Sequence, residues 1–235
     1  MNLISITNKQ TKIVKTTILF FLLFFSFQLN VKAAVNCGTL TNSGTVTISW
    51  TDSYCFFGHP GNASNTSGAA DEATYTNDGT ISLRYRNVRA FYNGFDDTTM
   101  VNNGTIESNA QHRYGYQSAF HDEGDNGESI NNGTINLDYG ASGGNKNNGA
   151  FRFNVGSGQS FTNSSGASIT VIGLDNNPGG MISSDNTTVT NNGTFTIGGS
   201  GTSQKAIQYY SGADGQTLIN TGTITQSGST DAILN

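Results

Sequence analysis

The sequence of 235 residues contains few charged residues, two prolines and two cysteines. Charged residues make up 11% of the chain, whereas an ordinary globular domain has about 25%. This composition excludes an ordinary globular enzyme, and two cysteines are too few for a scaffold held together by disulfides. The spacings that bind zinc ions, such as CxxC and HExxH, are also absent from the sequence.

Glycine, asparagine, threonine and serine dominate the rest of the chain. The 30 glycines and the many asparagines favour turns, whereas threonine, isoleucine, valine, phenylalanine and tyrosine favour strands. A disordered chain of similar polarity would have few aromatic residues and no regular apolar spacing. Aromatic residues make up 10% of this chain, so we expect an all-β domain with many short strands and turns.

Residues 1–33 have the pattern of a secretory signal peptide. Three lysines precede an apolar run at 18–25, and Val31 and Ala33 suit cleavage before Ala34. The run is shorter than the ~20 residues that a membrane-spanning helix needs, although an uncleaved anchor is the alternative. We therefore expect a secreted protein.

Cleavage would leave seven basic and sixteen acidic residues, a charge of −9. Such a charge argues against nucleic acid and anionic membranes as partners. Both cysteines, Cys37 and Cys55, lie near the new N-terminus, and an oxidising compartment would allow a disulfide between them.

The dominant feature of the sequence is a repeated Asn-x-Gly-Thr motif. Its spacing of about 28 residues is typical of a solenoid. The regular copies after residue 75 contain the asparagines Asn77, Asn102, Asn131, Asn191 and Asn220 and the glycines Gly79, Gly104, Gly133, Gly193 and Gly222. A degenerate copy begins at Asn163. We expect the stacked asparagines to form a hydrogen-bonded ladder and the glycines to supply the positive φ of a turn. Unrelated hairpin turns are the alternative.

A second motif, a small residue followed by an apolar one, repeats in phase with the first. Its copies are Ala90-Phe91, Ala119-Phe120, Ala150-Phe151, Gly180-Met181, Ala206-Ile207 and Ala232-Ile233. We interpret each period as one coil of a parallel β-helix with two strands and two turns. The sequence thus predicts an N-terminal cap and a first irregular coil at 34–75, out of register with the later coils. About six repeats would follow at 76–235, ending in mid-coil.

These motifs behind a signal peptide resemble the passenger regions of bacterial autotransporters and filamentous-haemagglutinin-like adhesins. The resemblance covers roughly residues 34–235 and implies a right-handed, three-sided parallel β-helix that is exported through the periplasm to the cell surface. It also implies an outer-membrane barrel as translocator, absent from these residues, so we expect a truncated or split member of the family. The family's Gly-Asp-Ser-Gly-Ser protease motif is not found. The implied function is adhesion to a host or environmental surface or glycan, without catalysis.

The densest candidate site is the acidic segment at 121–128. We interpret it as a solvated acidic loop and expect no cofactor, with Ca²⁺ bound by its carboxylates as the alternative. We take Tyr92, His121, Asp122, Glu123 and Asp125 as candidate binding residues. Other tyrosines that could stack on sugar rings are Tyr114, Tyr116, Tyr209 and Tyr210.

Two further functions stay open at this point. A polysaccharide lyase or glycosidase would need paired carboxylates and a base on consecutive coils. Asp96, Asp97, Asp122, Glu123 and Arg152 are the candidates, beside a column that we expect to contain Tyr92, His121, Arg152, Ile182 and Gln208. An ice-binding protein would need a flat Thr-x-Thr array. Pairs such as Thr45 and Thr47, or Thr194 and Thr196, fit such an array, although Glu107 and Asn136 interrupt it.

Overall fold

The computed structural model describes residues 37, 39–49, 53–61, 66–85, 87–108, 117–139, 149–173, 178–198, 205–210, 212–227 and 233–234. All of them belong to the unit that spans 34–235. The predicted signal peptide at 1–33 lies outside the described residues, as do Tyr114 and Tyr116. Every regular element described is a strand, and none of these residues forms a helix that could cross a membrane.

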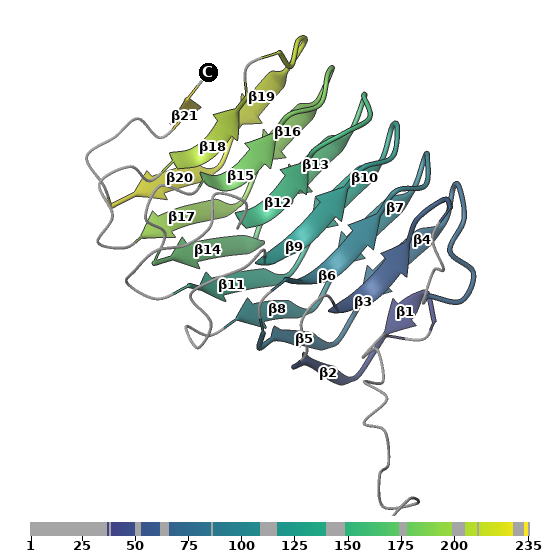
Figure 1. Cartoon of the computed structure of the whole chain (residues 1–235). Coiled ribbons are helices and arrows are strands. Elements are labelled where there is room, and N and C mark those ends of the chain that lie inside the picture. The colour runs from purple at the N-terminus through teal and green to yellow at the C-terminus, as the bar shows by residue number, and fades with distance from the viewer. Residues whose placement is uncertain are drawn as a thin grey trace, which may run out of the picture. The chain divides into compact units, whose positions relative to one another are not determined.

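The strands form three parallel sheets of seven strands each (Figure 1). The first sheet contains β1 (Thr41–Asn42), β4 (Thr74–Asn77), β7 (Thr99–Asn102), β10 (Glu128–Asn131), β13 (Ser160–Asn163), β16 (Thr188–Asn191) and β19 (Thr217–Asn220). The second contains β2 (Thr45–Ile48), β5 (Thr80–Leu83), β8 (Thr105–Ser108), β11 (Thr134–Asp138), β14 (Ser168–Ile172), β17 (Thr194–Gly198) and β20 (Thr223–Gln226). The third contains β3 (Ser53–Gly58), β6 (Val88–Asn93), β9 (Gln117–Asp122), β12 (Gly149–Phe153), β15 (Pro178–Ile182), β18 (Lys205–Tyr209) and β21 (Ile233–Leu234).

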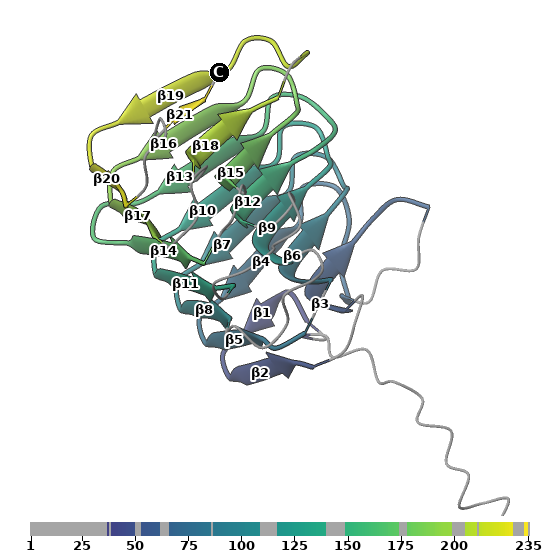
Figure 2. The ribbon, with the colours of Figure 1, turned by 60° about the vertical axis from the view of Figure 1, so that its left-hand side comes forward.

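The all-β parallel solenoid is confirmed, and two details of the prediction are wrong. Each coil has three strands, one in each sheet, as the three-sided resemblance implied and not two as the motifs indicated (Figure 2). The segment predicted to be an out-of-register cap forms a regular first coil, because β1, β2 and β3 pair in parallel with β4, β5 and β6. The described stack therefore has seven coils, where the sequence predicted a cap and about six repeats.

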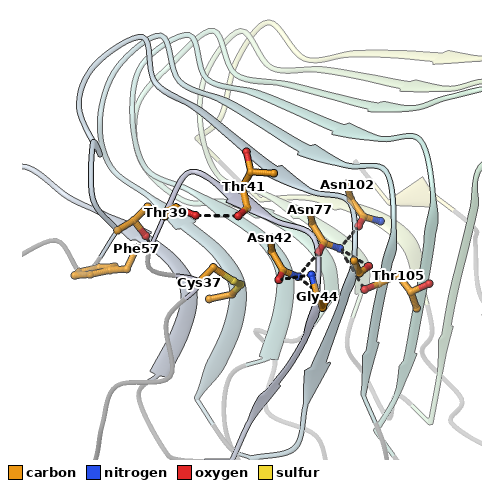
Figure 3. Close-up of a disulfide and its surroundings, with 12 residues drawn as sticks. Cys37, Thr39, Thr41, Asn42, Gly44, Phe57, Asn77, Asn102 and Thr105 are labelled. Carbon is orange, nitrogen blue, oxygen red and sulfur yellow. Dashed lines mark hydrogen bonds between the residues drawn. A yellow bond between two sulfur atoms is a disulfide. The ribbon is translucent and has the colours of Figure 1, made fainter.

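The expected asparagine ladder lies at the corner between the first and second sheets, which we call the Asn corner. The Nδ2 atom of Asn42 donates to Oδ1 of Asn77 at 2.8 Å, and Asn77 donates to Asn102 at 2.7 Å (Figure 3). The same bond continues through Asn131, Asn163, Asn191 and Asn220. Stacked amides in this column satisfy one another while the backbone turns.

The glycines of the Asn corner serve a different purpose from the one we predicted. None of Gly79, Gly104, Gly133, Gly193 and Gly222 has a positive φ. Instead, a Cβ at any of these positions would overlap a carbonyl oxygen of the preceding coil, as Gly133 would overlap Gly104. The motif requires glycine because successive backbones approach closely there.

The left-handed residues lie at another corner, where the third sheet leads into the next coil. We call it the Asp corner; its paired positions are Asp71-Glu72, Asp96-Asp97, Asp125-Asn126, Ser157-Gly158, Asp185-Asn186 and Asp214-Gly215. The second residue of every pair has φ between 54° and 76°. Aspartate carboxylates of the first positions accept backbone N–H groups of the next coil, for example Asp125 N to Asp96 Oδ1 at 2.9 Å. Several of the chain's acidic residues therefore stabilise the turn at the Asp corner.

The core follows from the small-apolar motif of the third sheet. In β6 both Ala90 and Phe91 are buried, whereas Arg89 and Tyr92 are half-buried, because the alternation of the strand is interrupted at the alanine. Stacking then places phenylalanine on phenylalanine: the ring centroids of Phe91 lie 4.8 Å from Phe56 and 4.9 Å from Phe120. The motif fills the narrow interior with a column of rings.

The predicted alignment of this motif is wrong in the fifth coil. Phe151 pairs with Gly180, not with Met181, and a Cβ at Gly180 would overlap the Phe151 ring. The glycine thus leaves space for the ring of the preceding coil. As a result Met181, instead of Ile182, lies beside Arg152 in the outward column.

The two cysteines form the expected disulfide. Cys37, which precedes β1, is bonded to Cys55 of β3, and the Cys37 N–H also donates to the Cys55 carbonyl at 2.8 Å. Figure 3 shows the disulfide beside the first residues of the asparagine ladder. The bond therefore holds the entry of the chain against the third sheet of the first coil.

Candidate functional site

The outer surface of the third sheet changes character in its first three coils. The outward positions there are Tyr54 and Phe57 on β3, Arg89 and Tyr92 on β6, and Ser118 and His121 on β9. His59 and Glu123 follow β3 and β9 directly. We call these eight residues the β3–β6–β9 face. Aromatic, basic and acidic groups gather here on a chain whose outward positions are mostly threonine, serine and asparagine elsewhere.

Glu123 lies at the centre of the polar contacts on this face. Its Oε2 accepts a hydrogen bond from the Tyr92 hydroxyl at 3.0 Å, and its Oε1 lies 2.9 Å from Nε2 of His121. These hydrogen bonds, with His121 contributing most, lower the pKa of Glu123 to about 2. The carboxylate is therefore ionised at any pH near neutrality.

His59 reaches the same carboxylate from two coils away. Its Nε2 lies 3.6 Å from Oε2 of Glu123. The residue between them in the stack is Gly94, and any side chain there would overlap the His59 ring. Gly94 thus permits the contact between the first coil and the third.

His121 is a buried, neutral imidazole under ordinary conditions. Its side chain is 3% exposed, and burial lowers its pKa to about 4, against the opposing effect of Glu123. Because Nε2 faces the Glu123 carboxylate, the proton of the neutral ring belongs on Nε2. Nδ1 is buried without a hydrogen-bond partner.

Four of the side chains form a contiguous aromatic and cationic surface. The rings of Tyr54 and Phe57 stack at 4.9 Å, and those of Phe57 and Tyr92 stack at 5.2 Å. The guanidinium carbon of Arg89 lies 5.5 Å from the centre of the Tyr54 ring and 5.1 Å from that of Tyr92. Burial and the Glu123 charge raise the pKa of Tyr92 to about 12, so its hydroxyl remains protonated.

Asp122 belongs to the interior and not to this face. It is fully buried, and its Oδ1 accepts hydrogen bonds from Asn93 Nδ2 at 2.9 Å and Gly124 N at 3.2 Å. Oδ2 has no partner. Burial raises the pKa of Asp122 to about 7. Asp122 thus continues a short ladder from Asn93, and its carboxyl, which is mostly protonated below about pH 7, takes the place of an amide.

The carboxylates of the acidic segment 121–128 do not converge on one point. Asp122 is buried and Glu123 contacts His121. Asp125 is exposed at the Asp corner and accepts the Ser157 N–H at 2.8 Å, and Glu128 is exposed on β10. Successive side chains of a strand point to opposite sides, and the chain turns at the corner that follows β9. The four carboxylates therefore point in different directions. Within the described residues, no cluster of three or more metal-binding side chains occurs. These carboxylates are therefore not brought together as the Ca²⁺ alternative requires.

The constellation considered for polysaccharide cleavage is also dispersed. Asp96 and Asp97 lie at the Asp corner, where Asp96 accepts the Asp125 N–H. Asp122 is inside the coil, where a substrate bound at the surface does not reach it. Arg152 does follow His121 in the outward column, as predicted, and donates to Asn154 at 2.8 Å. The paired-carboxylate geometry that the hypothesis needs is not formed by Asp122 and Glu123.

The threonine columns on the second sheet lie where the sequence predicted them. The first column is continuous and runs through Thr45, Thr80, Thr105, Thr134, Ser168, Thr194 and Thr223. The second is broken by Glu107 and Asn136. Glu107 also pairs with Arg84 at 2.6 Å, so a charged pair interrupts the regular array.

Sequence reasoning identified Tyr92, His121 and Glu123 but missed Tyr54, His59 and Arg89. The missed residues carry no repeated motif, and two of them lie in the segment interpreted as a cap. Tyr209 and Tyr210 lie at and just after β18, away from this face. No family model matches the chain, and neither the curated proteins nor the solved structures provide a similar protein.

Proposed function

We propose that this chain is an exported surface protein that binds glycans or another exposed surface, and that it is the passenger region of an autotransporter-type adhesin. The observation that carries the proposal is the β3–β6–β9 face, where stacked rings lie beside charged groups on an otherwise small and polar solenoid. Half-exposed aromatic rings with polar groups at their edges suit recognition of sugar rings. A rigid stack of coils displays such a face without a deep pocket.

Export is supported by two independent features. The signal-peptide pattern at 1–33 directs secretion, and the Cys37–Cys55 disulfide suits an oxidising compartment. We therefore expect the exported chain to begin at Ala34. N-terminal sequencing of the protein recovered from outside the cytoplasm tests this, and an intact residue 1 on the exported chain would contradict it.

Binding is tested with the purified exported chain on a broad glycan panel and on intact cells. We expect saturable binding to a subset of glycans or cells. A matched test with polysaccharides as substrates measures the competing enzymatic function through release of new reducing ends. Absence of binding to every surface would contradict the adhesin function, and cleavage that is lost in Glu123→Gln would favour the enzyme.

A further inference from the structure

We propose that the β3–β6–β9 face recognises a sugar that carries a single carboxylate, with Arg89 as the group that binds the carboxylate. This inference rests on the proposed glycan-binding function and names the class of sugar. It depends on three observations: the unpaired charge of Arg89, the rings against which it lies, and unused polar atoms beside it.

Arg89 has no acidic partner in the part of the chain that the structure describes. Its polar contact is a hydrogen bond from Nη1 to the Tyr54 hydroxyl at 3.4 Å. Arg84, only five residues earlier, instead contacts the Glu107 carboxylate at 2.6 Å. The nearby carboxylate of Glu123 is already engaged by Tyr92, His121 and His59. Arg89 is thus a half-buried cation whose charge is not compensated by any carboxylate among the described residues.

The surroundings of Arg89 fix its position without neutralising it. Its guanidinium lies against the rings of Tyr54 and Tyr92, and such contacts hold the group while leaving its N–H donors available. A guanidinium binds a carboxylate through two parallel hydrogen bonds. The adjacent rings of Phe57 and Tyr92 offer the apolar surface on which the C–H face of a sugar packs.

Two polar atoms next to Arg89 and Tyr92 are also unused. In the third sheet, Ser118 pairs with Arg89 and His121 pairs with Tyr92, so all four side chains share the outward side. Ser118 Oγ and His121 Nδ1 are buried without a hydrogen-bond partner. Burying a polar atom without a partner is unfavourable. These two atoms lie just beneath the face and retain hydrogen-bonding capacity that no partner satisfies.

The charge of the whole chain limits the ligand to one carboxylate. The chain after residue 33 carries −9, so a polyanionic polysaccharide would be repelled by the rest of the molecule. A short neutral oligosaccharide that ends in one acidic sugar brings a single negative charge to Arg89. Sialic acids and uronic acids share this chemistry.

The test measures the binding of three soluble probes to the purified exported chain by calorimetry. The probes are 3′-sialyllactose, lactose capped with one glucuronic acid, and unmodified lactose. We expect one acidic probe to bind at least about tenfold more tightly than lactose. The two acidic probes distinguish the two sources of the carboxylate.

Variants locate the binding group. Arg89→Ala should lose about tenfold or more in affinity for the acidic probe, and Arg89→Lys should retain part of it because the charge remains but the planar fork is lost. Arg84→Ala is the matched control and should bind as the wild type does. Arg89→Gln serves if Arg89→Ala unfolds, and circular dichroism confirms that each variant is folded.

Three outcomes would overturn the inference: equal affinity for acidic and neutral probes, no binding of any probe, or equal losses in Arg89→Ala and Arg84→Ala. The proposed function fails separately. If the wild type binds other glycans or cells but not the acidic probes, the adhesin function stands and the carboxylate specificity is wrong. If nothing binds to the chain, both are wrong.

Discussion

The Asn corner and the β3–β6–β9 face are built by opposite means. At the Asn corner the same residues recur in coil after coil, and each asparagine donates to the next. On the β3–β6–β9 face no residue type recurs at equivalent outward positions: Phe57, Tyr92 and His121 occupy one such position in three coils. Identical residues in successive coils stabilise the stack, because their side chains hydrogen-bond to one another. Outward residues that differ from coil to coil indicate a surface whose side chains have a role other than stacking.

The largest loss of stability should follow from a methyl group placed between two successive coils. Gly133→Ala would put a Cβ into the backbone of Gly104 and Asn103, and we expect a loss of about 3–5 kcal/mol in the free energy of unfolding. Gly44→Ala is the control, because a Cβ there meets nothing within 4 Å. Chemical denaturation should show a change below about 0.5 kcal/mol for the control. Equal effects would contradict close approach as the reason for glycine.

A smaller loss should follow from interrupting the ladder. Asn131 is buried and donates to Asn163, while Asn102 donates to it. Asn131→Ala leaves these partners unsatisfied and should cost about 3 kcal/mol. Its neighbour Asn132 is exposed and makes a similar bond to Asn103, so Asn132→Ala should cost less than about 1 kcal/mol. If denaturation midpoints shift equally, the buried ladder has no special importance.

Asp122 is buried at the end of β9, behind the β3–β6–β9 face, and its effect on stability depends on pH. Its pKa is about 7 in the folded protein and 3.8 in a model compound, so the folded state holds more protons between these values. Asp122 alone should therefore make stability fall as the pH rises from about 4 to 7, by roughly 1.4 kcal/mol or less per pH unit. His121 acts in the opposite direction up to about pH 6.5, because its pKa of about 4 lies below the ordinary value of 6.5. Asp122→Asn should therefore make stability rise more steeply with pH over this range than it does in the wild type, because an amide needs no proton to take the same place.

The exposed Asp125 provides the control for that experiment. Asp125→Asn should keep the slope of the wild type in thermal unfolding measured across the same pH range. If Asp122→Asn has the same pH dependence of stability as the wild type, Asp122 is ionised in the folded protein throughout this range.

The smallest effect on stability belongs to the β3–β6–β9 face. Tyr92→Phe removes the hydroxyl that donates to Glu123 but retains the ring, and should cost about 0.5–1.5 kcal/mol. The same change should raise the pKa of Glu123 above about 2, because a hydrogen bond that favours the carboxylate is lost. Carbon-detected NMR titration of the Glu123 carboxyl measures this directly, and an unchanged pKa would contradict the assigned contact.

The fold could be predicted from the sequence where the same residues recur in successive coils, and not where the residues vary. The Asn corner was predicted because the pair formed by Asn77 and Gly79 recurs in the next coils. The strand before each asparagine was missed, because its inward position is filled in turn by Tyr75, Met100, Ser129, Phe161, Val189 and Leu218. The Asp corner was overlooked although Asp followed by Asp, Asn or Gly recurs in phase.

The candidate site was predictable only in part, for the same reason. Tyr92, His121 and Glu123 were found through an acidic segment and a column beside it. His59 and Arg89 reach the site through stacking of separate coils, and the contact of His59 with Glu123 depends on Gly94. A single sequence does not reveal which residues stack unless the register of the first coil is known, and that register was the part predicted wrongly.

The most direct test of the central claim compares binding and stability in two double variants. Tyr54→Ala with Tyr92→Ala alters the β3–β6–β9 face, and Thr194→Ala with Thr223→Ala alters the regular threonine column. Binding to the cells or glycans that the wild-type chain recognises is measured beside the denaturation midpoint. We predict that the tyrosine pair loses binding while remaining folded and that the threonine pair binds as the wild type does. Loss of binding in the threonine pair, with the tyrosine pair unaffected, would contradict the account.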